Sequence, residues 1–241
     1  MTNDTVGHPA SPKTKIVGIG LNKTGTKTLG HYLARWGYRN RSYDSNTTRE
    51  SPAFRLYEAG DIDALMAIVE QHDSFEDWPW PLLYEEIDAR FDDVKFVLTT
   101  RASSDTWFRS LCNMAVRIGP MPLFEKTVYG FARPHGHKSE FVTRYEAHNA
   151  SVRAYFEHRP DDLLELCWEN GDNAETLAQF VGVNGVDTSP LHSNRSPATV
   201  YSGNSRFRAT LARWHYLWLG APHSLGRRIR DAVARRIGRA G

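Results

Sequence analysis

The feature that most constrains the fold is a glycine-rich turn between an apolar run and a helical pattern. Residues 15–20 read KIVGIG, a short β-branched run that is typical of a buried strand. Residues 18–27 read GIGLNKTGTK, and apolar residues then recur with helical spacing at Leu29, Leu33 and Trp36, up to Gly37. A strand, a glycine-rich turn and a helix N-terminus in this order bring several N–H groups together. The sequence therefore predicts an anion site, although an ordinary tight strand-to-helix connection has the same outline.

Strands and helices alternate along the rest of the chain. We expect further strands within residues 38–43, 73–80, 94–101 and 161–172, and helices within 60–72, 82–91, 104–116, 139–159 and 173–183. This alternation predicts an α/β fold, a three-layer parallel sheet with a P-loop-type strand–loop–helix unit. We assign the α/β domain to residues 15–204, after a flexible leader at 1–14 and before a basic helical tail at 205–241. Residues 117–138 fit no element and suggest a mobile lid or an acceptor-binding insert.

The polar residues of the turn suit a phosphate that arrives without a metal ion. They supply two positive charges and three hydroxyl groups: Lys23, Lys27, Thr24, Thr26 and Thr28. A nucleoside triphosphate loop, G-x-x-x-x-G-K-[ST], places its lysine directly after the second glycine and holds Mg²⁺ with the next hydroxyl. Here threonine follows Gly25, and the clearest strand, residues 94–101, ends in arginine rather than in an aspartate for the metal. The pattern favours a metal-free donor whose charge is met by lysine, arginine and main-chain N–H groups.

Two motifs resemble those of the sulfotransferases. Residues 22–29, NKTGTKTL, are similar to the family's 5′-phosphosulfate loop, P-K-[ST]-G-T-T-x-L, with asparagine in place of proline and Lys27 in place of a threonine. The second family motif is a strand ending in arginine, followed about eight residues later by a helical serine. VKFVLTTRASSDTWFRSL resembles it, with Arg101 and Ser110 nine residues apart. Residues 75–86 and 148–172 are similar to the bacterial and fungal branch of P-loop sulfotransferases. The resemblance runs from about Lys15 to Arg195.

The resemblance implies that the donor is 3′-phosphoadenosine 5′-phosphosulfate and that no metal takes part. It implies a 5′ site made by Lys23, Thr24, Gly25, Thr26, Lys27 and Thr28. Lys23 is also implied as a catalytic residue, because its charge would stabilise the bridging oxygen during transfer. Arg101 and Ser110 would bind the 3′-phosphate. Arg195, in the late segment LHSNRS, is a candidate third ligand, although a surface turn fits that segment equally well.

An acceptor hydroxyl also needs a base. Asp77 occupies the place where related sulfotransferases carry a His or Glu, shortly before the second motif, so we predict that it is catalytic. Trp78 and Trp80 could form an apolar wall that raises its pKa. The structural alternative is that Asp77 only caps the helix after Pro79. The rival bases are Glu76, Asp44 and His31.

Charge and cysteine content limit the other functions. The net charge is +2, but from Arg206 onward nine arginines face one acid, which leaves −6 on the first 205 residues. A uniformly basic nucleic-acid binder would not look like this. In the tail, apolar residues recur every four positions at Leu225, Ile229, Val233 and Ile237. They predict a basic amphipathic helix that contacts either a membrane surface or the protein body or a partner subunit.

The sequence therefore predicts a cytoplasmic sulfotransferase, and a contact of its tail with the inner membrane face is one alternative for its placement. Two cysteines, Cys112 and Cys167, cannot form a disulfide framework, and no apolar run is long enough to span a membrane. The acceptor would be a hydroxyl of a small molecule, glycan or lipid, and no nucleic acid is expected as a partner. The alternatives are a nucleotide-dependent kinase with a degenerate loop, and a non-catalytic nucleotide-binding or scaffold protein.

Overall fold

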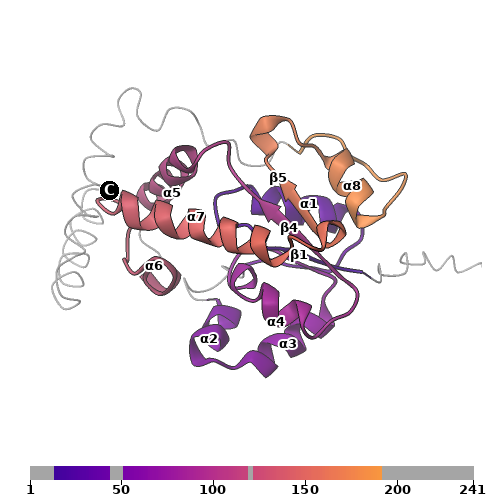
Figure 1. Cartoon of the computed structure of the whole chain (residues 1–241), viewed down its shortest axis with the longest axis horizontal. Helices are drawn as coiled ribbons and strands as arrows, with labels where there is room; N and C mark the ends of the chain where they lie inside the picture. The colour runs from indigo at the N-terminus through magenta and orange to yellow at the C-terminus, as the bar shows by residue number, and fades with distance from the viewer. Residues whose placement is uncertain (1–13, 44–50, 119–121, 192–241) are drawn as a thin grey trace, which may run out of the picture.

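Short apolar runs form the strands of one parallel sheet. The computed structural model describes residues 14–43, 51–118 and 122–191. Within these residues, five parallel strands pair in the order β2-β3-β1-β4-β5. Their bounds are β1 Lys15–Gly18, β2 Asn40–Arg41, β3 Ser74–Phe75, β4 Val94–Thr99 and β5 Leu163–Leu166. The first strand therefore lies at the centre of the sheet, between β3 and β4. Figure 1 shows β1, β4 and β5 side by side in this order.

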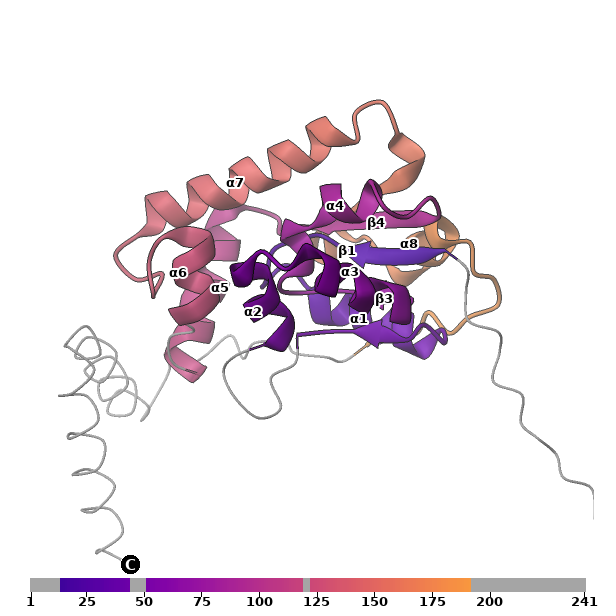
Figure 2. The same cartoon turned by 90° about the horizontal axis from the view of Figure 1, so that it is seen from below.

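Helices cover both faces of the sheet, so the predicted three-layer α/β architecture is confirmed. Successive residues of a strand face opposite sides. Ile16 and Val97 join an apolar core with α1 and α8, whereas Val17 and Phe96 join a second core with α3, α4 and α7. Figure 2 shows α7 and α1 on opposite sides of the sheet. The bounds of these helices are α1 Thr26–Arg35, α3 Ile62–Gln71, α4 Tyr84–Asp88, α7 Lys138–Tyr155 and α8 Ala174–Val181.

A third apolar cluster lies next to the loops that leave β1 and β3. It is built by α2 (Pro52–Ala59), α5 (Ser104–Ile118), α6 (Pro122–Tyr129) and α7. Its buried residues are Leu21, Phe54, Trp78, Trp107, Leu111, Val128, Tyr129, Phe141 and Tyr145. Leu21 belongs to the glycine-rich turn and Trp78 follows β3. The cluster therefore packs directly against the two segments in which the sequence places catalytic residues.

Three local features differ from the sequence-based expectation. The patterns did not predict α2, and they left residues 117–138 unassigned, where the structure has α6. Each of these helices spans only eight residues and begins with proline, which is too short for a clear helical period. At the start of α5 the sequence suggests Ser104 or Asp105 as the cap, because both are polar residues that open the helical pattern. In the structure, Ser103 Oγ accepts a hydrogen bond from the Thr106 N–H at 3.1 Å. The tail at 205–241 and the leader up to residue 13 lie outside the described residues.

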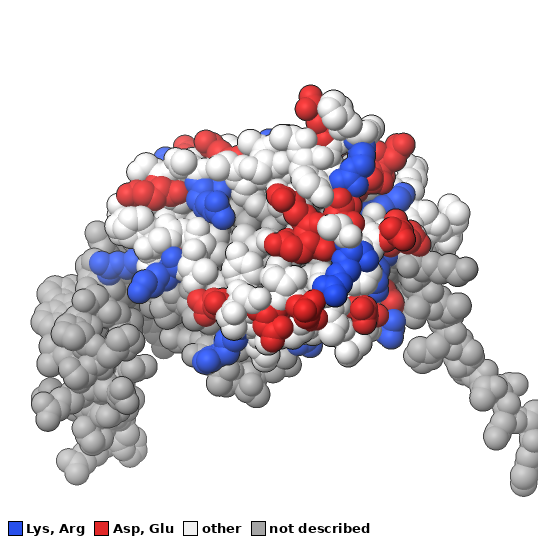
Figure 3. All heavy atoms as spheres, turned by 60° about the horizontal axis from the view of Figure 1, so that its bottom comes forward, with Lys and Arg blue, Asp and Glu red and all other residues white. Residues whose placement is uncertain are grey.

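The surface of the described part mixes charges. Figure 3 shows Lys and Arg side chains interspersed with Asp and Glu over one face, so this face is not a continuous basic surface. None of the helices described here has the length and apolar character that crossing a membrane would require.

Candidate functional site

The glycine loop, residues 19–25, joins β1 to α1 beside the exit of β4. A Cβ atom on Gly20 would lie 2.7 Å from the main-chain nitrogen of Thr99, and closer still to the oxygens of that residue. Gly25 has a φ of 98°, and a Cβ there would overlap the indole ring of Trp168. Glycine is therefore required at both positions. Because α1 begins directly after Gly25, the N–H groups at its N-terminus lie at the end of the loop.

The threonines of the loop partly serve the protein interior. Thr24 is 1% exposed, and its Oγ1 donates to the Leu21 carbonyl at 2.6 Å and lies 2.6 Å from Thr99 Oγ1. Its hydroxyl thus ties the loop to β4, and a contact between Thr24 and a ligand would come through the main chain. Thr26 is also buried, and its side chain forms a hydrogen bond with Glu76. Thr28 is half-buried.

Lys23 and Asp77, the predicted catalytic pair, lie at the exits of the neighbouring strands β1 and β3. Their φ angles are 73° and 67°, in the left-handed region that side chains other than glycine seldom adopt. Burial raises the pKa of Asp77, while a hydrogen bond from the Trp78 N–H and the charges of Lys27 and Lys23 oppose this rise. The structure therefore brings both lysines and Asp77 within electrostatic reach of one another.

Glu76 lies directly beside this pair, in a drier environment. Its side chain is 2% exposed, and its Oε2 has no hydrogen-bond partner among the described residues. Burial, followed by the charge of Asp77, raises the pKa of Glu76 to about 7, although hydrogen bonds with Ser42 and Thr26 and the charge of Lys27 lower it. Glu76 and Asp77 are thus neighbouring carboxyl groups with different surroundings: Glu76 lies against α1 at Thr26 and Gly30, and Asp77 lies within reach of the charges of Lys23 and Lys27. Of the other rival bases, His31 is exposed on α1 and Asp44 lies outside the described residues.

Arg101, the predicted ligand of the 3′-phosphate, lies beside the glycine loop. Its Nε and Nη2 donate to the two carboxylate oxygens of Glu169 at 3.0 and 2.5 Å, and its Nη1 donates to the Lys23 carbonyl at 3.2 Å. The Ala102 N–H also donates to Glu169 at 3.1 Å. Arg101 therefore connects Glu169, in the segment after β5, to Lys23, whose ammonium group is predicted to be catalytic.

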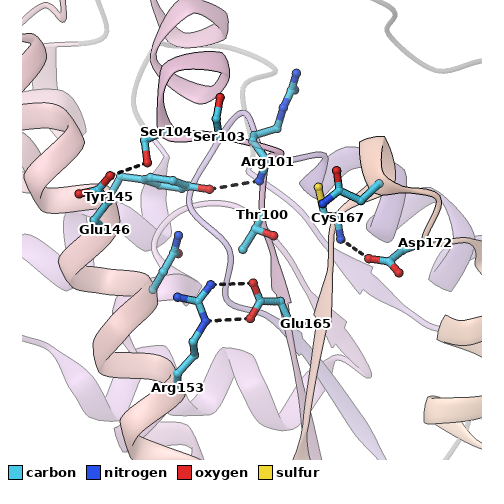
Figure 4. Close-up of a pocket in the computed structure, with 12 residues that line it drawn as sticks. Thr100, Arg101, Ser103, Ser104, Tyr145, Glu146, Arg153, Glu165, Cys167 and Asp172 are labelled. Atoms are coloured by element: carbon cyan, nitrogen blue, oxygen red, sulfur yellow. Dashed lines mark hydrogen bonds and ion pairs between the residues drawn. The ribbon is translucent and has the colours of Figure 1, made fainter.

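A polar pocket of about 440 Å³ opens beside Arg101, between α7 and the exits of β4 and β5 (Figure 4). Its rim includes Ser103 and Ser104, and Ser110 is not among its lining residues. Ser110 is half-buried on α5. In the lower part of the close-up, Arg153 and Glu165 form a two-armed ion pair with N–O distances of 2.9 and 2.7 Å. Arg195 lies outside the described residues, so its role as a ligand stays a prediction.

A comparison with protein families covers the part of the chain that holds these residues. A family model described as a sulfotransferase domain matches residues 15–196, well over half of the chain. The chain belongs to the sulfotransferase domain family. No curated protein matches it. The family match covers the glycine loop, the carboxyl pair and Arg101, and it ends one residue after Arg195.

In this sulfotransferase domain, sequence reasoning missed the residues after β5. Trp168 packs against Gly25 and stacks on Tyr32 with ring centroids 5.9 Å apart, and Glu169 holds Arg101. The available signal was their position, because ligands of parallel α/β sheets bind outside the carboxyl ends of the strands. The roles of Trp168 and Glu169 depend on contacts with Gly25, Tyr32 and Arg101, which lie far from them in the sequence.

Metal ligands do not gather in the described part of the sulfotransferase domain. Within residues 14–43, 51–118 and 122–191, no group of three or more His, Cys, Asp or Glu side chains is placed to hold an ion.

Proposed function

We propose that this sulfotransferase transfers a sulfuryl group from 3′-phosphoadenosine 5′-phosphosulfate to a hydroxyl group of its acceptor. The observation that carries the proposal is the meeting of three strand exits. Lys23 follows β1, the Glu76–Asp77 pair follows β3, and Arg101 follows β4 and touches the Lys23 carbonyl. One edge of the sheet therefore carries both the cations that would bind the donor and the carboxyl groups that would take the proton of the acceptor.

The glycine loop supports binding of the 5′-phosphosulfate. Main-chain N–H groups of the loop and of the first turn of α1 converge there, and Lys23 and Lys27 add full charges. Arg101 is held with its guanidinium beside the same loop, which suits contact with the second phosphate of the donor. The two anionic parts of one nucleotide would thus bind at two ends of a single surface.

Transfer needs one bond to form while another breaks. The acceptor oxygen attacks sulfur, its proton passes to a carboxylate, and the bond between sulfur and the bridging oxygen breaks with the electron pair left on the phosphate. Lys23 would stabilise the charge that develops on that oxygen. We assign the proton to Asp77, because its raised pKa and its position opposite the lysines suit a base, and Glu76 remains the alternative.

The acceptor belongs to the class of small molecules, glycans or lipids that carry a hydroxyl group. We further propose that the protein works in the cytoplasm without nucleic acid as a partner. Its basic tail would contact either the inner membrane face or a protein surface. These proposals rest on the sequence, because the tail lies outside the described residues.

Calorimetric titration with 3′-phosphoadenosine 5′-phosphate, the desulfated product, tests the proposal. ATP serves as the control nucleotide, and both nucleotides are titrated once with EDTA and once with Mg²⁺. We expect micromolar binding of the bisphosphate and none of ATP. Radiolabelled donor with a panel of hydroxyl acceptors then tests turnover. A preference for ATP that depends on Mg²⁺ would favour a kinase instead, and tight bisphosphate binding without turnover on any acceptor would favour a non-catalytic binding protein.

A further inference from the structure

Lys23 and Asp77 share a backbone geometry that needs support from their surroundings. Both are non-glycine residues with φ near 70°, and such residues cluster where neighbouring contacts hold the chain in place. Lys23 follows Asn22 in the glycine loop, and Asp77 precedes Trp78 after β3. The contacts of Asn22 and Trp78 therefore determine how firmly the two predicted catalytic residues are held.

Asn22 is fixed through both of its carbonyl groups. The Trp107 indole N–H donates to its main-chain oxygen at 2.9 Å, and the Tyr129 hydroxyl donates to its side-chain Oδ1 at 3.2 Å. Asn22 is 4% exposed and Tyr129 is 5% exposed, so water does not compete freely for these bonds. The related family pattern has proline at this position, whose ring fixes φ. Here hydrogen bonds from α5 and α6 take over that restraint.

Trp78 touches the same tyrosine. The rings of Trp78 and Tyr129 meet edge to face with centroids 6.3 Å apart, and Trp78 is 1% exposed. Tyr129 is itself held by Phe141 of α7, on which it stacks with a centroid distance of 4.4 Å. Burial, together with the charges of Glu125 and Asp77, keeps the pKa of Tyr129 well above its ordinary value, so its hydroxyl stays a donor.

We propose that Tyr129 of α6 is a positioning residue that holds both predicted catalytic segments of the sulfotransferase. Its hydroxyl restrains the residue before Lys23, and its ring restrains the residue after Asp77. This inference rests on the proposed function for the roles of Lys23 and Asp77. It also assigns a structural role to α6, which lies inside the segment 117–138 that the sequence left unassigned. Because α6 packs on α7, this support comes from outside the sheet.

Two variants separate the contributions of the hydroxyl and the ring. Hydrogen exchange of the ligand-free full chain reports the opening of residues 22–26 and 77–80 without any substrate. Tyr129→Phe should speed exchange at 22–26 roughly fivefold, the factor that corresponds to about 1 kcal/mol for one hydrogen bond. Its ring remains, so exchange at 77–80 should change little. Tyr129→Leu should speed exchange in both segments.

Tyr155→Phe is the matched control, because Tyr155 also donates a hydrogen bond, to Asp88 Oδ2 at 2.7 Å, away from the loop. It should leave both segments at wild-type rates. Wild-type exchange at 22–26 in Tyr129→Phe, or a uniform acceleration over the whole chain, would overturn the proposal. If Tyr129→Leu does not fold, Tyr129→Phe alone still decides the loop contact.

Binding of 3′-phosphoadenosine 5′-phosphate supplies a functional readout. Tyr129→Phe and Asn22→Ala should each weaken it about fivefold to tenfold, because a smaller fraction of the protein has a preformed loop. The double variant should be no weaker than either single one, since both remove the same bond. Independent, multiplying losses would contradict the proposal. If the wild type does not bind the bisphosphate, the proposed function fails, whereas the exchange result still decides whether Tyr129 holds the loop.

Discussion

Replacing Glu76 by glutamine should stabilise the protein, and the gain should depend on pH. Glu76 is 2% exposed, and burial with the neighbouring charge of Asp77 raises its pKa from 4.5 to about 7. Between these two pH values the folded protein holds a proton that the unfolded chain has released. Stability is therefore lost as pH rises from 4.5 through about 7. Glutamine has almost the same shape and carries no charge at any pH.

The magnitude follows from the pKa difference. Each pKa unit corresponds to about 1.36 kcal/mol, so the ionised Glu76 costs the folded state about 3 kcal/mol above pH 7. Below pH 4.5 the carboxyl group is neutral in both states, and the substitution should then change little. Near pH 8 the variant should be more stable than the wild type by up to about 3 kcal/mol. The gain is reduced because Lys27 loses the attraction of the Glu76 charge.

Urea unfolding of the wild type and Glu76→Gln at several pH values from 4.5 to 8.5 measures this difference. The matched control is Glu157→Gln, a substitution at an exposed glutamate just past the end of α7. The control should show no pH-dependent gain. A Glu76→Gln variant whose advantage is the same at pH 5 and pH 8, or which is less stable than the wild type at pH 8, would refute the burial argument.

Three further predictions concern the proposed transfer reaction. Lys23→Ala should lower turnover about 10²–10³-fold, because one donor that stabilises the transition state is lost. The control Lys95→Ala, at the other end of β4, should leave turnover unchanged. Equal rates in the two variants would remove Lys23 from the mechanism. Arg101→Ala should weaken binding of the bisphosphate by about 2 kcal/mol in calorimetry, at the low end for a charged pair because its side chain is 23% exposed. Asp77→Asn should lower turnover about 10²-fold or more with nearly unchanged bisphosphate affinity, and a larger loss in Glu76→Gln than in Asp77→Asn would transfer the role of base to Glu76.

The layered fold could be predicted because its signals are local. The apolar run before the glycine loop, the helical spacing after it and the β-branched run at 94–101 each lie within one short window. The N-cap of α3 has an equally local signal, since Asp61 directly precedes the helical pattern and accepts a hydrogen bond from the Ala64 N–H at 3.0 Å. Lys23, Asp77 and Arg101 lie at one edge because the parallel strands β1, β3 and β4, which they follow, all end on that side.

The rest of the site depends on contacts between remote residues. Tyr129 reaches Asn22 across 107 positions, Trp107 reaches it across 85, and Glu169 reaches Arg101 across 68. No periodicity within a window of ten or twenty residues carries such information, and α6 itself is too short to show one.

The two departures from the family pattern become intelligible only through these remote contacts. From the sequence alone, Asn22 and Lys27 would be expected to weaken a phosphate-binding loop. In the structure, the side-chain carbonyl of Asn22 is the acceptor that joins the loop to Tyr129. Lys27 brings a second charge that opposes the raised pKa values of Glu76 and Asp77. A loop lying beside two buried carboxyl groups gains from an extra cation, so Lys27 offsets the acidic exit of β3. Replacing Lys27 by threonine should therefore raise the pKa of both carboxyl groups further, rather than restore a better anion site.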